Sequence, residues 1–115
     1  MQKIFDSHFH IIDPKFPLEE NQGFVPDYYT VNDYLKELKE MSIEVTGGAI
    51  VSGSFQGYHQ DYFADAISEL GNNFVGITQL PFHTTNEEIL KLNDIGIKGI
   101  RFNLYRGLST SPKEI

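Results

Sequence analysis

Two histidines separated by one residue, His8 and His10, form the strongest chemical signal in the sequence. Residues i and i+2 of a β-strand project from the same face, so the two imidazoles could bind one cation or contact one substrate. In a regular strand Asp6 shares that face, where its carboxylate could accept a hydrogen bond from an imidazole. The alternative is that the pair occurs by chance or has only a structural role.

The second signal is Arg101, which interrupts the apolar segment 99–104 and is followed by Arg106. A guanidinium buried without a partner is costly, so we expect Arg101 to pair with a buried carboxylate or to face an anionic ligand. Arginine can bind both oxygens of a carboxylate, which favours a small carboxylated molecule as the ligand. For Arg106 the alternative is a solvated cation in a loop.

A weaker signal is the segment 51–57, in which glycines and hydroxyl groups follow an expected strand. Ser54 and Gln56 could contact a ligand there, although the composition favours a plain turn. His59 and His83 are isolated and are expected to be solvated loop residues. The sequence contains neither a glycine-rich nucleotide-binding pattern nor a nucleophile elbow.

The composition narrows the classes of function. The chain has 115 residues, a formal net charge of −7 and no cysteine. This acidity argues against binding to nucleic acid or to anionic membranes. Disulfides, thiolate metal sites and a cysteine nucleophile are excluded, so any metal must use histidine or carboxylate ligands. No apolar run approaches the ~20 residues that span a bilayer, and we expect a cytoplasmic protein.

Strands and helices are expected to alternate along the chain. Apolar residues recur with the helical period in 31–41, and Thr30 with Asp33 and Thr85 with Glu88 suggest capping boxes. We predict strands at 3–10, 45–51, 74–80 and 99–104, and helices at 31–41, 60–70 and 86–94. This order favours parallel βαβ units, in either a doubly wound sheet or a (β/α)8 barrel. Both architectures place their sites at the carboxyl ends of the strands, where the histidine pair lies.

Segment 5–10, followed by Asp13 and Pro14, resembles the opening of the amidohydrolase superfamily. Segment 99–103 resembles a segment typical of the branch that contains 2-pyrone-4,6-dicarboxylate lactonase. Residues 79–81 also fit the pattern of this family. The resemblance implies a TIM-type (β/α)8 barrel. Because such barrels have ~250 residues, residues 1–115 would supply about the first four strands and three helices of a single domain.

The same resemblance implies roles for individual residues. His8 and His10 would bind a divalent metal such as zinc or manganese, or would line the substrate site in a metal-free member. Arg101 and Arg106 would hold substrate carboxylates. Ser54 and Gln56 match a polar pair that can touch substrate, but the family pattern has histidine where Gln56 stands. The aspartate that serves as general base in the family lies in a later strand.

We therefore predict a hydrolase of a small carboxylated lactone, ester or amide, which uses water attack at the histidine pair. A metal-dependent non-oxidative decarboxylase of the same superfamily is one alternative. A non-catalytic half-barrel that binds ligands is another. Four strands cannot close an eight-stranded barrel, so we expect either a longer protein or a homo-oligomer in which two copies pair. The expected partner is the small-molecule substrate, without nucleic acid or membrane.

Overall fold

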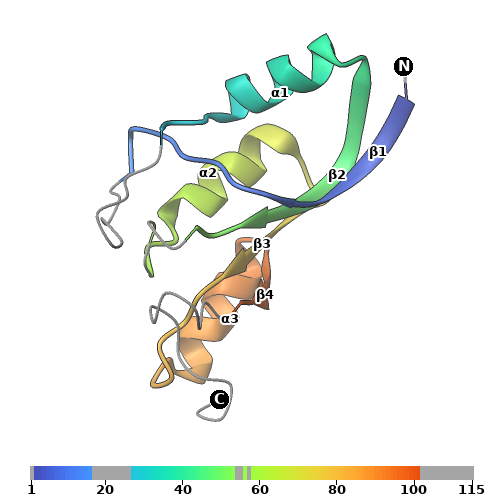
Figure 1. The fold of residues 1–115 in the computed structure, drawn as a ribbon. Coiled ribbons are helices and arrows are strands. Elements are labelled where there is room, and N and C mark those ends of the chain that lie inside the picture. Colours follow the sequence, from blue (N-terminus) through green and yellow to red (C-terminus); the bar gives the residue numbers. More distant parts are fainter. Residues whose placement is uncertain (1, 17–26, 54–55, 57, 102–115) are drawn as a thin grey trace.

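The computed structural model describes residues 2–16, 27–53, 56 and 58–101 (Figure 1). Strands and helices alternate in the predicted order. The elements are β1 (Gln2–Phe9), α1 (Val31–Glu40), β2 (Ile43–Val51), α2 (Asp61–Leu70), β3 (Phe74–Thr78), α3 (Asn86–Asp94) and β4 (Ile97–Ile100).

The four strands form one parallel sheet in the order β1-β2-β3-β4. Because βαβ crossovers are right-handed, strands that follow one another in this order carry their connecting helices on the same face. Figure 1 shows α1 and α2 along one side of the curved sheet. The protein is thus an α/β fold with the arrangement predicted for the first four strands and three helices of a (β/α)8 barrel.

The hydrophobic core lies between the sheet and its helices. Its buried members come from β1, β2, β3, β4, α1 and α2, and from the segment that follows β1: Phe9, Ile11, Val31, Tyr34, Leu38, Ile50, Tyr62, Phe63, Ala66, Phe74 and Ile97. Phe63 of α2 packs so closely on β3 that a Cβ atom at Gly76 would lie 2.6 Å from its ring. Glycine at this position therefore lets the helix approach the strand.

The helix ends largely follow the sequence signals. Thr30 and Asp33 form the predicted capping box at the start of α1. At the start of α3 the Thr85 side chain accepts a hydrogen bond from the Glu88 backbone, which is one of the two bonds of the predicted box. Each described helix has only 9 or 10 residues, and none is long and apolar enough to cross a bilayer.

The boundaries of all four strands differ from the prediction. β1 is shifted by one residue, to Gln2–Phe9, and β3 ends at Thr78 rather than at residue 80. β2 begins at Ile43, two residues before the predicted start, and β4 begins at Ile97 rather than at residue 99. Residues 102–104 of the predicted fourth strand lie outside the described residues. Arg101 therefore directly follows the described end of β4 at Ile100, where its side chain can lie at the carboxyl edge of the sheet.

Candidate functional site

A β-bulge in β1 determines which way the side chains near the histidine pair point. Asp6 pairs with Gly48 and Phe9 pairs with Ile50, so three steps along β1 match two steps along β2. The extra residue turns Asp6 and Phe9 toward the same helix. The Asp6 carboxylate accepts from the Tyr34 hydroxyl of α1, and its predicted hydrogen bond with an imidazole stays a prediction.

His8 and His10 come together as their spacing predicted. Their ring centroids are 5.1 Å apart and the ring planes are almost perpendicular. His8 is exposed at the end of β1, whereas His10 directly follows the strand and is partly buried. Two imidazoles at the carboxyl edge of a parallel sheet therefore lie side by side, where parallel α/β folds carry their sites.

The protonation state of His10 is restricted by its surroundings. Its Nδ1 atom lies 2.6 Å from the carbonyl oxygen of Val51. A carbonyl can only accept, so Nδ1 carries the proton and donates it. Burial lowers the pKa of His10, the bond to Val51 opposes this, and His8 and Arg101 lower the pKa further. At neutral pH the imidazole is therefore neutral, with its lone pair on Nε2.

Arg101 reaches the same region from the other end of the sheet. Its backbone N–H donates to the Thr78 carbonyl at the end of β3, and its Nη1 donates to the Ser52 carbonyl at 2.5 Å. Within the described ranges no carboxylate forms an ion pair with this guanidinium. Burial lowers the pKa of Arg101, but arginine keeps its charge at neutral pH. The described partner of the guanidinium is thus a backbone carbonyl, and an anionic ligand stays a prediction.

His10 and Arg101 thus converge on consecutive carbonyl groups at the end of β2. His10 contacts the carbonyl of Val51, and Arg101 contacts that of Ser52. The sequence alone did not indicate this role of the β2 backbone, because every residue has a main-chain carbonyl group and the residue type does not show which of them accepts a hydrogen bond. A cation and a neutral imidazole are thereby held near each other at one edge of the sheet.

Gln56 is buried and both ends of its amide group bind backbone. Its Oε1 accepts from the Gly53 N–H at 2.8 Å, and its Nε2 donates to the Ile11 carbonyl at 2.9 Å. These bonds tie the segment after β2 to the segment after β1. The described contacts of Gln56 are therefore structural, and a contact with substrate stays a prediction. Ser54 and Arg106 lie outside the described residues.

The two isolated histidines have different surroundings. His83 is exposed, as expected of a loop residue, and its ring contacts Phe82 edge-on with centroids 5.8 Å apart. His59 is half-buried, and its backbone N–H donates to the Gln56 carbonyl. No described contact brings either of them to His8 or His10.

The histidine pair fits two positions in the coordination shell of a divalent metal. Perpendicular imidazoles with centroids 5.1 Å apart can direct one nitrogen each at a common ion. Catalytic zinc sites use three protein ligands, however, and the described part of the chain contains no group of three or more histidine, aspartate or glutamate residues that could hold a metal. His8 and His10 would thus be two ligands of an incomplete set.

The comparisons with known proteins concern the sequence and the fold of the chain. No protein-family model matches the chain. A curated 2-pyrone-4,6-dicarboxylate hydrolase from Comamonas testosteroni is 23% identical over 118 aligned positions, which cover 95% of this chain and 36% of that protein. The chain therefore spans just over a third of the length of this relative.

Two solved structures share the fold. The crystal structure of a probable 2-pyrone-4,6-dicarboxylic acid hydrolase from Acinetobacter baumannii, with citric acid bound, matches with a TM-score of 0.79 and 29% identity, over 96% of this chain and 41% of that one. An apo structure from Agrobacterium tumefaciens matches with a TM-score of 0.70 over 87% of this chain and 36% of that one, and at 19% identity it shows the fold alone. In sequence and fold the chain is similar to 2-pyrone-4,6-dicarboxylate hydrolases, the branch that its motifs predicted.

Proposed function

We propose that the protein containing this chain hydrolyses a small carboxylated lactone, with Arg101 holding a substrate carboxylate and the histidine pair beside the reacting carbonyl. The observation that carries the proposal is the convergence of His10 and Arg101 on the end of β2. The names of two relatives, both hydrolases of a pyrone dicarboxylate, support the same substrate class.

Arg101 suits a carboxylate because one of its five N–H donors is used by Ser52 and the guanidinium remains partly exposed. The bond to Ser52 fixes the direction of the guanidinium before the substrate arrives. A fork fixed in this way loses little side-chain entropy on binding. It would orient the substrate so that the ring carbonyl, rather than the carboxylate, lies against the imidazoles.

The reaction adds water across the ring C–O bond. The water oxygen bonds to the carbonyl carbon, a base takes its proton, and the ring oxygen leaves with the electron pair of the broken bond. His10 is neutral, so its imidazole could accept a proton or a positive charge during this step. A divalent metal, when bound to the pair, would polarise the carbonyl and lower the pKa of its water.

The test is an assay of the purified full-length protein with 2-pyrone-4,6-dicarboxylate, in which the loss of the pyrone absorbance and the identity of the product are followed. Ring opening without loss of carbon dioxide supports the proposal, whereas release of carbon dioxide would show a decarboxylase. His8→Ala should reduce kcat by at least ~10²-fold while the thermal unfolding midpoint changes little. His83→Ala, at an exposed loop position, is the matched control and should keep full activity.

The role of a metal is tested separately. The protein is stripped with a chelator and titrated with Zn²⁺ or Mn²⁺ in a calorimeter. If the pair supplies ligands, His8→Ala and His10→Ala should each weaken binding, while His83→Ala should not. Equal affinity in all four proteins would remove metal from the proposal and leave the imidazoles lining a metal-free site.

A further inference from the structure

We propose that Tyr34 of α1 is a positioning residue that holds the histidine pair in place through Asp6 and Phe9. This inference rests on the proposed function, since it assigns the pair a chemical task. Tyr34 touches neither imidazole in the described contacts, so it would act through the backbone of β1.

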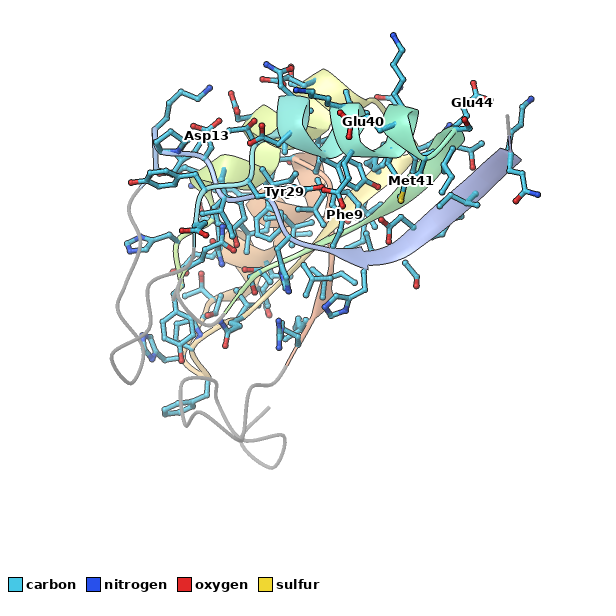
Figure 2. All side chains as sticks on the ribbon, turned by 45° about the horizontal axis from the view of Figure 1, so that its top comes forward. Phe9, Asp13, Tyr29, Glu40, Met41 and Glu44 are labelled. Atoms are coloured by element: carbon cyan, nitrogen blue, oxygen red, sulfur yellow. The ribbon has the colours of Figure 1, made fainter. Side chains whose placement is uncertain are left out.

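Tyr34 has two contacts with the bulged part of β1. Its hydroxyl group donates to Oδ2 of Asp6 at 2.9 Å, and its ring stacks on the ring of Phe9 with centroids 4.2 Å apart and planes 4° from parallel. Phe9 is the residue between the two histidines. Figure 2 shows Phe9 and Tyr29 beneath α1, on the side where the helix faces β1.

Asp6 connects the hydroxyl of Tyr34 to the backbone of His8. While Oδ2 accepts from Tyr34, Oδ1 accepts from the His8 backbone N–H at 3.2 Å. This N–H lies at the bulge, where one residue of β1 has no counterpart in β2. The Asp6 carboxylate therefore accepts a hydrogen bond from a backbone N–H in the part of β1 where the regular pairing with β2 is interrupted. Asp6 and Phe9 flank His8, so Tyr34 restrains the strand on both sides of it.

The environment of Tyr34 suits a fixed donor. The residue is 3% exposed, and it lies on the buried stripe of α1 with Val31 and Leu38. Burial, the hydrogen bond to Asp6 and the Asp6 charge all raise the pKa of Tyr34, so its hydroxyl keeps its proton throughout the physiological range. Burial of the phenol favours its hydrogen bond to Asp6 over one to water, which is what a positioning role requires.

The test uses Tyr34→Phe, which removes the hydroxyl and keeps the stack on Phe9. Tyr29→Phe is the matched control, because Tyr29 also lies beside α1 but donates to Glu37 of the helix rather than to β1. The readouts are kcat and KM of the full-length enzyme, amide hydrogen exchange at His8, and the NMR shifts of the His8 and His10 imidazoles. The thermal unfolding midpoint of each variant is recorded.

For Tyr34→Phe we expect kcat to fall about tenfold with KM within twofold, since small displacements of reacting groups slow the chemical step. We also expect faster exchange of the His8 amide and shifted imidazole resonances, with none of these changes in Tyr29→Phe. Unchanged His8 exchange and unchanged kcat would overturn the inference. If the protein hydrolyses no carboxylated lactone, the proposed function fails, but exchange and imidazole shifts still decide whether Tyr34 positions the pair.

Discussion

The Nδ1 atom of His10 donates to the carbonyl oxygen of Val51 across a distance of 2.6 Å, which connects the end of β1 to the end of β2. The bond selects one tautomer and one ring orientation of His10 before any ligand binds. Catalytic groups that are oriented in advance need less reorganisation when the substrate arrives. The bond therefore has consequences for titration, substrate binding and stability that can be measured.

The first prediction concerns the titration of His10. Burial is the largest influence and lowers its pKa below the ordinary 6.5. Between the folded pKa and 6.5 the unfolded chain binds more protons than the folded one, so stability should fall as the pH drops through this window. NMR titration of the His10 ring in the metal-free protein should give a pKa below 6.5. A value at or above 6.5 would contradict the assignment of a neutral imidazole.

Arg101→Met provides the second prediction. Hydrogen bonds to charged groups contribute about 1.5–3 kcal/mol, so loss of the guanidinium should raise KM for a dicarboxylate roughly 10- to 100-fold. It should also raise the pKa of His10, because the Arg101 charge lowers that pKa. Arg101→Lys keeps the positive charge but lacks the two parallel N–H donors of the guanidinium. It should therefore bring the pKa of His10 close to the wild-type value while KM stays raised. A loss of thermal stability with unchanged KM would instead mark Arg101 as structural.

The third prediction addresses Gln56, whose family-based role is substrate contact. Gln56→Ala leaves the Gly53 N–H and the Ile11 carbonyl without their partner inside the protein. An unsatisfied buried polar group costs about 1–3 kcal/mol, so urea unfolding should show a clear loss of stability. Gln60→Ala is the control, because its described bonds to Thr78 and Gln79 are long, at 3.4 Å. A rise in KM with unchanged stability would favour the substrate role.

Local patterns were enough to predict the order of the elements, but not the partners of the site residues. The apolar stripe of α1 and the Thr30 cap depend on neighbours in sequence, and both are present. The need for a partner at Arg101 was also predictable. Its described partner is the backbone carbonyl of a residue 49 positions away. The residue type at that position does not indicate that its carbonyl group accepts this bond. Likewise the stripe predicted that Tyr34 is buried, but not that its hydroxyl binds Asp6.

The bulge could not be predicted because the rule of alternating faces assumes a regular strand. Its geometry depends on contacts between segments far apart in sequence. Asp6 accepts from a hydroxyl 28 positions later, and β2 brings Gly48 against the backbone of Asp6. Glycine in a strand is a sign of such a close approach, and the adjacent pair Gly47 and Gly48 is the signal that could have indicated it.

The last prediction follows from this close approach. A Cβ atom at Gly48 would lie 2.4 Å from the Asp6 carbonyl oxygen, which belongs to the backbone and cannot rotate away. Gly48→Ala should therefore push β1 from β2 and cost at least about 1–3 kcal/mol of unfolding free energy, as overpacking does elsewhere. Gly99→Ala is the control, since its Cβ would lie 3.2 Å from Ile77 Cγ1, an atom of a side chain that can adjust. Urea unfolding compares the two variants.

In Gly48→Ala the His8 amide should also exchange faster with solvent, because the strand register that brings the Asp6 carboxylate to this amide is lost. Equal stability of the two variants would show that the β1–β2 contact yields easily, and the bulge would then not be the rigid support that the histidine pair requires.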